Sequence, residues 1–317
     1  MGYERRARLV PSRKSRSNLV PQVRQTSIAL ICVLAASAAA QEPPRATFVS
    51  ATQIRAALEK LNDRPGGTSA GFVAAPSYKV LVARRMAPAL AEVHPAWTDI
   101  WYVISGGGVV VTGGSLIEAT AQRAGELRGR AVAGGEEHHI ATGDLIAIPA
   151  GVPHWVRSIT GNEIVCLVVR ARSAGDSVLP AEGATVEFFS ATQLDSAAHR
   201  TPENGPSLTG VDLDTHPSYS NGLARRTAPG RADVHTSWTD VWYIIAGGGV
   251  LVTGGSLINA QERRPGEIRG SGIVGGEERH VAAGDVIVIP AGVPHWLRSI
   301  DEKEIVYLDP KVASPSR

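Results

Sequence analysis

The chain contains one long segment twice, the second copy lying 140 to 141 positions after the first. The run VTGGSLI at residues 111–117 is identical at 252–258, and IPAGVPHW at 148–155 recurs unchanged at 289–296. Units of solenoid arrays are roughly 20–50 residues long, so a period of this length indicates a duplicated domain and not a repeat array.

The repeat predicts two domains, at residues 45–172 and 184–311, joined by a linker at residues 173–183. The linker contains two glycines and a proline, which are typical of a domain joint. Each copy is long enough to bury a core of its own.

Residues 1–40 are predicted to be a secretory signal peptide. They carry seven basic side chains against one glutamate, followed by an apolar run at residues 28–36 and small residues ending at Ala40. This order is typical of a signal that is cleaved, here after Ala40. The apolar run is short for a membrane span, although an uncleaved anchor stays open as the alternative. We therefore expect a secreted or periplasmic protein with no membrane segment after signal removal.

Charge and cysteine content argue against two other kinds of protein. After residue 40 the chain keeps 25 basic and 29 acidic residues, and this mildly acidic body lacks the basic field that binds nucleic acid. Cys32 lies in the predicted signal, which leaves Cys166 alone within an apolar run. A disulfide framework is therefore not expected, and Cys166 is predicted to be a small buried residue.

Each copy is predicted to begin with a short helix and to continue as strands. Ser50 and Gln53 have the spacing of a capping box, and the apolar residues that follow lie on one helix face. Short β-rich runs then alternate with Gly and Pro turns, at residues 79–83, 100–104, 109–112, 144–148 and 164–169. Many short strands at close spacing favour an all-β sandwich or closed barrel.

The sharpest motif combines a turn, a buried strand, a tight turn and a histidine. It reads Gly-x5-Pro-x-Gly-x2-His from Gly143 to His154, and it returns without a gap from Gly284 to His295. This pattern resembles the second motif of the cupin superfamily, with Ser158 and Ser299 in place of the family's closing asparagine.

The first cupin motif, His-x-His-x3–4-Glu-x6-Gly, is present in an altered form. His94, Asp99 and Gly106 match from the second histidine onward, with Asp for Glu, and Glu92 takes the place of the first histidine. The resemblance implies eight metal ligands, four in each copy: Glu92, His94, Asp99 and His154, then Asp233, His235, Asp240 and His295.

A divalent metal is the cofactor that this resemblance implies. Residues two apart on a strand share a face, so Glu92 and His94 are expected to point into one cavity. Two histidines with one carboxylate suit Fe or Mn, and Zn is the third candidate. Glu92 and Asp233 have three possible roles, as metal ligands, as a general base or as surface carboxylates. Because the first motif is altered, a domain that binds no metal stays open as an alternative.

Aromatic and basic residues repeated in both copies are candidates for the substrate pocket. Trp101 and Trp242 lie two residues beyond the motif aspartates, so they either line the pocket or fill the barrel. Arg85 and Arg128, like their counterparts in the second copy, either bind an anionic substrate or pair with glutamates.

Taken together, the resemblance implies two tandem jelly-roll-like barrels, a bicupin. The expected function is that of a metal-dependent, dioxygenase-like oxidoreductase acting on a small oxygenated organic molecule, with catalytic residues not identified. The alternative is a non-catalytic bicupin that binds a small ligand or has a structural role. The expected partner is a small molecule, and a homodimer is compatible with the family. Motifs of serine hydrolases and nucleotide enzymes are absent from the sequence.

Overall fold

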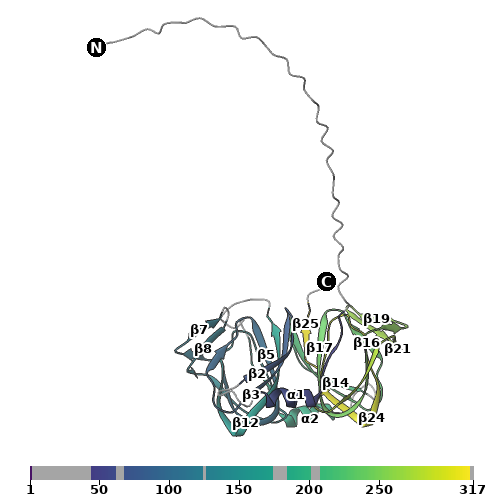
Figure 1. Ribbon diagram of the computed structural model, residues 1–317, viewed down its shortest axis with the longest axis horizontal. Coiled ribbons are helices and arrows are strands. Elements are labelled where there is room, and N and C mark those ends of the chain that lie inside the picture. Colours follow the sequence, from purple (N-terminus) through teal and green to yellow (C-terminus); the bar gives the residue numbers. More distant parts are fainter. Residues whose placement is uncertain (2–43, 62–67, 124–125, 174–183, 201–207, 315–317) are drawn as a thin grey trace, which may run out of the picture. The chain divides into compact units, whose positions relative to one another are not determined.

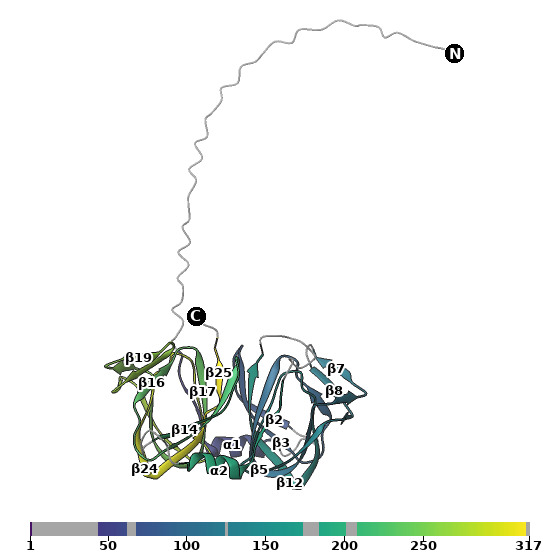
Figure 2. The same cartoon turned by 180° about the vertical axis from the view of Figure 1, so that it is seen from behind.

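Strands make up most of the chain that the structure describes. The computed structural model describes Met1 and residues 44–61, 68–123, 126–173, 184–200 and 208–314. Apart from Met1, the predicted signal peptide lies outside the described residues, as does most of the predicted linker. Figure 1 and Figure 2 show two curled sheets side by side, so the predicted all-β fold is confirmed.

Strands from each copy form a separate large sheet. The first barrel consists of β2 (Thr68–Ala74), β3 (Tyr78–Arg85), β4 (Ala91–Val93), β5 (Trp97–Thr112), β7 (Thr120–Arg123), β8 (Glu126–Gly129), β10 (Glu136–Ala141), β11 (Leu145–Ile148), β12 (His154–Arg172) and β13 (Glu187–Phe189), with a small ladder of β6 (Ser115–Ile117) and β9 (Ala131–Ala133). The second barrel consists of β1 (Thr47–Val49), β14 (Leu208–Thr215), β15 (Tyr219–Arg226), β16 (Ala232–His235), β17 (Trp238–Thr253), β19 (Gln261–Arg264), β20 (Glu267–Gly270), β22 (Glu277–Ala282), β23 (Val286–Ile289), β24 (His295–Leu308) and β25 (Lys311–Ala313), with a ladder of β18 (Ser256–Ile258) and β21 (Gly272–Val274).

The first strand of each copy belongs to the barrel of the other copy. β1 pairs with β23 of the second barrel, and β13 pairs with β11 of the first. Their phenylalanines follow the exchange, because Phe188 packs on the core of the first barrel and Phe48 on that of the second. Residues 43–317 accordingly form one compact unit.

Two short helices follow the exchanged strands and cross the junction in the same way. α1 (Ala51–Glu59) and α2 (Ala191–Ala198) each begin with the predicted capping box, at Ser50 and Ser190. The first backbone N–H of α1 donates to Asp285 at 2.8 Å, and that of α2 donates to Asp144 at 2.7 Å. Each helix is therefore also capped by an aspartate of the opposite copy, which favours its positive N-terminal end. Neither described helix is long or apolar enough to cross a bilayer.

The junction between the barrels is itself an apolar core. Ile54 and Leu194 from the two helices are buried with residues of both sheets, and the rings of Tyr102 and Tyr243 lie 5.1 Å apart across the junction. Burial of this kind is the main stabilising contribution in a fold without disulfides. Cys166 is free and buried, as predicted, and burial raises the pKa of its thiol to about 12.

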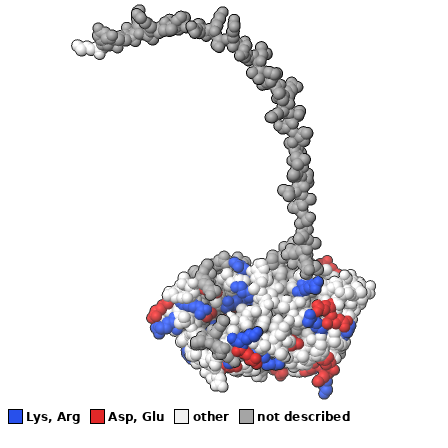
Figure 3. Space-filling view, viewed as in Figure 1, with Lys and Arg blue, Asp and Glu red and all other residues white. Residues whose placement is uncertain are grey.

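Charged side chains lie in small groups of mixed sign on the face shown in Figure 3. Among the residues drawn in colour there, no large area carries a single sign.

Candidate metal centres

The two cupin-like motifs meet because the backbone ties them together. Gly151, in the Pro-x-Gly turn, has φ of 80°, a conformation that a residue with a Cβ rarely adopts. Its N–H donates to the carbonyl of His94 at 3.1 Å, and β12 then begins at His154, directly opposite Glu92 of β4. The turn therefore brings a histidine from one motif beside the histidine of the other.

In the first barrel the structure brings together Glu92, His94 and His154. A ligand atom from each lies within 4.8 Å of the others, and all three side chains are buried. The two imidazole rings are 5.2 Å apart, and each histidine is only 4% exposed. These residues come from separate stretches of the chain and face one interior point, as the metal hypothesis requires.

This arrangement fits a metal ion, as the state of His154 indicates. Nδ1 of His154 donates to the carbonyl of Val152 at 3.1 Å, which leaves the lone pair on Nε2. Nε2 is buried and has no hydrogen-bond partner in the described chain. His94 Nε2 and Glu92 Oε2 are 3.2 Å apart. Ligands bound at about 2.1 Å lie about 3.0 to 3.4 Å from each other in octahedral or tetrahedral geometry.

Asp99, the fourth predicted ligand, has a different main partner. It is 1% exposed, and its carboxylate lies 2.9 Å from the Nε atom of Arg170. A terminal nitrogen of Arg170 also donates to His94 Nε2 at 2.9 Å. The predicted ligand set is thus divided between a candidate metal group and an ion pair beside it.

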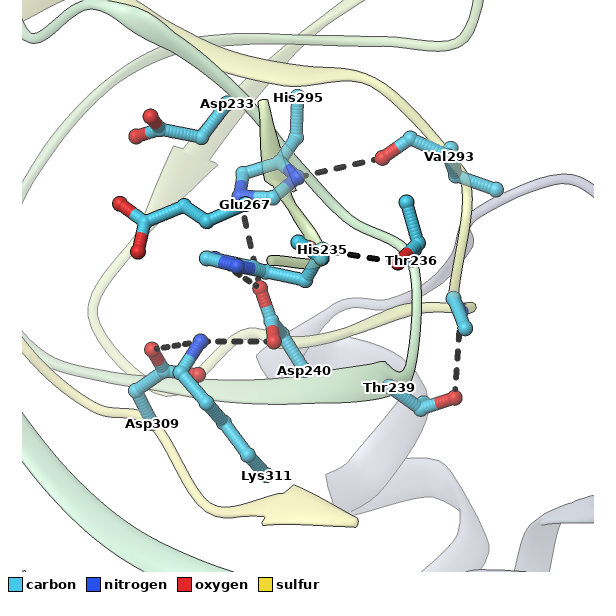
Figure 4. Close-up of polar contacts among 12 residues, drawn as sticks. Asp233, His235, Thr236, Thr239, Asp240, Glu267, Val293, His295, Asp309 and Lys311 are labelled. Carbon is cyan, nitrogen blue, oxygen red and sulfur yellow. Dashed lines mark hydrogen bonds and ion pairs between the residues drawn. The ribbon is translucent and has the colours of Figure 1, made fainter. Parts of the chain in front are cut away.

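The second barrel uses the other carboxylate. Here His235, Asp240 and His295 form the candidate group, and Figure 4 shows both imidazoles directed at the Asp240 carboxylate. The distances from its Oδ2 atom are 3.4 Å to His295 and 3.6 Å to His235. Asp233, the counterpart of Glu92, instead lies 2.9 Å from Arg269. Each barrel therefore presents two histidines and one carboxylate, but the carboxylate comes from a different position.

A basic residue accompanies the site in each barrel, and the sequence reasoning did not identify it. Lys311 lies 2.7 Å from Asp240 and 2.9 Å from Asp309, in the position that Arg170 has in the first barrel. The two positions are 141 residues apart, which is the repeat distance. A basic residue at equivalent positions of both copies is therefore the sequence feature that could have identified this part of the site.

Burial and neighbouring charges shift the pKa values of Glu92, His154 and His235. Burial alone raises the pKa of Glu92, but the hydrogen bond to His94 and the Arg85 charge hold that pKa well below its usual range. Burial, with the charge of His94, lowers the pKa of His154 to about 4. Burial and Lys311 lower the pKa of His235 to about 3. Neutral imidazoles and ionised carboxylates are the states that bind metal, whereas a carboxylate with so low a pKa is a poor general base.

The pKa of His154 predicts how stability depends on pH in the metal-free protein. Its folded-state pKa of about 4 lies below the unfolded value of about 6.5, so the unfolded chain binds more protons in between. Protonation then favours unfolding, and stability falls as pH is lowered through this window, by up to about 1.4 kcal/mol per pH unit. Urea unfolding at pH 4 to 7 after chelator treatment measures this slope, and His154→Gln is expected to reduce it; an unchanged slope contradicts the assignment.

The first barrel site opens onto a large cavity. This cavity of about 770 Å³ is lined by Trp101, apolar side chains and three arginines, namely Arg85, Arg128 and Arg170. Trp101 is thus a wall residue, and its indole N–H donates to Asp99 at 3.2 Å. Trp242 in the second barrel instead stacks on Tyr307, with ring centroids 4.3 Å apart. Tyr307 takes the position of Cys166, so a large side chain fills space that the first barrel leaves open.

The arginines form the Arg–Glu pairs that the sequence left open, and binding of an anionic substrate stays a prediction. Arg85 and Arg128 lie 3.4 Å and 3.2 Å from the same oxygen of Glu92, so each is part of an Arg–Glu pair. Both also line the cavity, where a bound anion would meet them.

Comparisons with known proteins agree with this architecture. The family described as "Cupin" matches residues 77–201, and the family described as "Cupin domain" matches residues 269–310. No curated protein is similar enough in sequence to count as a relative. A salicylate 1,2-dioxygenase from Pseudaminobacter salicylatoxidans has a similar structure, with a TM-score of 0.59 at 13% identity over 84% of this chain and 85% of that one. A cupin 2 conserved barrel domain protein from Leptotrichia buccalis gives a TM-score of 0.51 at 10% identity, over 86% of this chain and 99% of its own.

Proposed function

The chain belongs to the cupin superfamily as a bicupin, and on this basis we propose that it is a metal-dependent oxidoreductase whose first barrel acts on a small organic anion. The observation that carries the proposal is the position of the Glu92, His94 and His154 group at a cavity of about 770 Å³ lined by three arginines. Pockets that bind small molecules fall in this range of volume.

Charge balance in the cavity favours an anionic substrate. Three arginines face three carboxylates, those of Glu92, Asp99 and Glu126, so the ionised side chains nearly cancel. A divalent ion adds two positive charges, which a carboxylate substrate would offset. Arg85 and Arg128 each reach Glu92 through one terminal nitrogen, and a guanidinium has five N–H donors. Further donors of these two side chains are therefore suited to a substrate carboxylate.

The residues of the site have separable roles in this proposal. Glu92, His94 and His154 would hold a divalent ion, which would supply Lewis acidity and, as iron or manganese, activation of O₂. The carbonyl of Val152 orients His154, and Arg85 and Arg128 orient Glu92. Trp101 and the aliphatic wall exclude water from the reacting groups.

Hydroxylated aromatic carboxylates are the substrate class that fits best. One structurally similar protein is a salicylate 1,2-dioxygenase observed with gentisate. In the first barrel, Trp101 offers an aromatic edge and the arginines offer carboxylate donors. Inserting both atoms of O₂ into such a substrate needs no external reductant.

The test combines metal analysis with oxygen uptake. Elemental analysis of the purified full chain is expected to find one or two Fe, Mn or Zn ions per chain. An oxygen electrode is then used with salicylate, gentisate and non-aromatic carboxylates, and uptake is expected with an aromatic acid only. Chelator treatment is expected to abolish uptake, and restoring the native metal is expected to recover it. Metal-free protein, or uptake that survives chelation, would overturn the proposal.

Binding of an anion without catalysis is a second candidate function, supported by Arg170. Its guanidinium already places a fixed cation 2.9 Å from His94 Nε2, where a metal-free binding site would need one. Calorimetry separates the two functions, because non-catalytic binding predicts full affinity for an aromatic acid in protein that carries no metal.

We further propose export of the chain, with the N-terminus of the mature protein at Gln41, which N-terminal sequencing tests.

A further inference from the structure

A third cluster of ligand-type side chains lies at the junction, away from both barrel sites. We call Glu187, Asp214, His216, Tyr219 and Asn221 the junction cluster. Glu187 belongs to β13, which pairs with the first barrel, whereas Asp214 of β14 and Asn221 of β15 belong to the sheet of the second. The cluster therefore joins the exchanged strand of one sheet to an edge of the other.

We propose that the junction cluster binds a divalent transition-metal ion such as Zn²⁺, which fastens the exchanged strand β13 to the second barrel. Glu187, Asp214 and His216 present ligand atoms that all lie within 4.8 Å of one another. Nε2 of His216 lies 3.4 Å from Oε1 of Glu187. Two ligands of a tetrahedral zinc ion, each bound at about 2.1 Å, are about 3.4 Å apart.

Unpartnered polar atoms give independent support. Nε2 of His216 and Oε2 of Glu187 are shielded from solvent and have no hydrogen-bond partner among the described residues. The hydroxyl of Tyr219 is also unpartnered, and Tyr219 is only 3% exposed. Burial and the nearby charges of Asp214 and Glu187 raise the pKa of this hydroxyl. Leaving several buried polar atoms unsatisfied is costly, and a bound ion would satisfy them.

The surroundings orient the ligands as in other metal sites. Asn221 is fully buried, and its backbone and side-chain N–H groups donate to the two oxygens of Asp214 at 2.8 Å and 2.6 Å. The ring of His216 stacks on Tyr219 with centroids 4.4 Å apart. Such contacts hold ligating side chains in place. The side chains of Glu187 and His216 stay 25% and 30% exposed, which gives an ion a path from solvent.

The donor set identifies the class of ion. Two carboxylates with one imidazole suit Zn²⁺ or Mn²⁺, whereas Ca²⁺ prefers oxygen ligands alone. A cation in the cluster removes the repulsion between these two carboxylates.

Internal duplication provides a natural comparison. The corresponding positions of the first copy are Thr47, Val73, Ala75, Tyr78 and Val80, so only the tyrosine is shared. The first copy meets the structural need at these positions with no ionisable residue other than the tyrosine. The polar residues at the four other positions of the second copy thus indicate a function that the first copy lacks at its side of the junction.

Zinc titration of the full chain tests the proposal independently of the barrel function. We use the variant His154→Ala/His295→Ala, treated with chelator, so that the barrel sites are disabled. Calorimetry with ZnCl₂ is expected to show one ion per chain, and Zn²⁺ in large excess is expected to raise the thermal midpoint by roughly 5 °C. Adding His216→Ala, the residue of the first copy, is expected to weaken binding at least 10-fold, whereas His199→Ala, at an exposed histidine outside the cluster, leaves it unchanged.

Glu187→Gln, which keeps the side-chain shape, provides a second test, because it is expected to shift the thermal midpoint in opposite directions without and with metal. Without metal at pH 8 it is expected to raise the thermal midpoint, because the repulsion with Asp214 is lost. With Zn²⁺ it is expected to lower the midpoint relative to the parent, because a ligand is lost. If the barrel variant does not fold, the same substitutions in the otherwise unchanged chain are expected to reduce the zinc stoichiometry by one. Absence of zinc binding, or binding unaffected by His216→Ala and Glu187→Gln, would overturn the proposal.

Discussion

His154→Ala is expected to remove the metal ion of the first barrel and to lower kcat/KM at least 100-fold. The imidazole presents a buried, unpartnered Nε2 atom to Glu92 and His94, and alanine leaves that side of the site empty. Loss of residues that merely orient metal ligands costs about 10- to 100-fold, so loss of a ligand itself should cost more. Elemental analysis and oxygen uptake measure the two effects separately.

His139→Ala is the matched control for this experiment. His139 is an exposed histidine of β10 and takes no part in the site, so metal content and turnover are expected to stay unchanged. His295→Ala is expected to remove the ion of the second barrel instead, which assigns each ion to its barrel. Full metal content together with full turnover in His154→Ala would contradict the assignment of the first site.

Cys166→Tyr is expected to close the cavity of the first barrel and to weaken binding of an aromatic acid at least 10-fold, with metal content retained. The second barrel shows that a tyrosine fits here. Tyr307, at the equivalent position, is fully buried against Trp242 and accepts a hydrogen bond from Arg226 at 3.0 Å. The first barrel offers the same neighbours, Trp101 and Arg85, so the new side chain has a stacking partner and a donor.

The control for the cavity experiment is Cys166→Ala, which removes one atom from the wall. It is expected to bind the acid as well as the parent does and to lose about 1 kcal/mol of stability through the small cavity created. Calorimetry with salicylate and elemental analysis on the same samples give both readouts. If Cys166→Tyr binds the acid with parental affinity, the cavity is not the binding site.

Most of the fold could be predicted from the sequence, because it depends on local chemistry. The Ser50 and Ser190 capping boxes marked both helices, and the Pro-x-Gly turn placed His154 at a strand start. Such features are decided within a few residues, by backbone sterics and hydrogen bonding. The exchange of β1 and β13 could not be predicted, because both copies carry the same strand and either barrel offers it an equivalent edge.

The ligand sets show the same limit at the level of side chains. The motif positions predicted eight ligands. The sequence around these residues does not indicate that Arg170 pairs with Asp99 while Arg269 pairs with Asp233. Those contacts join residues far apart in the chain or on neighbouring strands. Glu92 and Asp240 are paired with basic residues as well, so the packing of the whole site decides which carboxylate joins the histidines.

The sequence by itself therefore determined that this chain has two β-barrels with paired histidines in each, since turn geometry and strand alternation are properties of short segments. Only the tertiary structure decided that the first barrel site lies at a cavity while Tyr307 stacks on Trp242 in the second barrel, and that Glu187 meets Asp214 and His216 at the junction. Both depend on which distant side chains share one small volume, and that is a consequence of packing the whole chain.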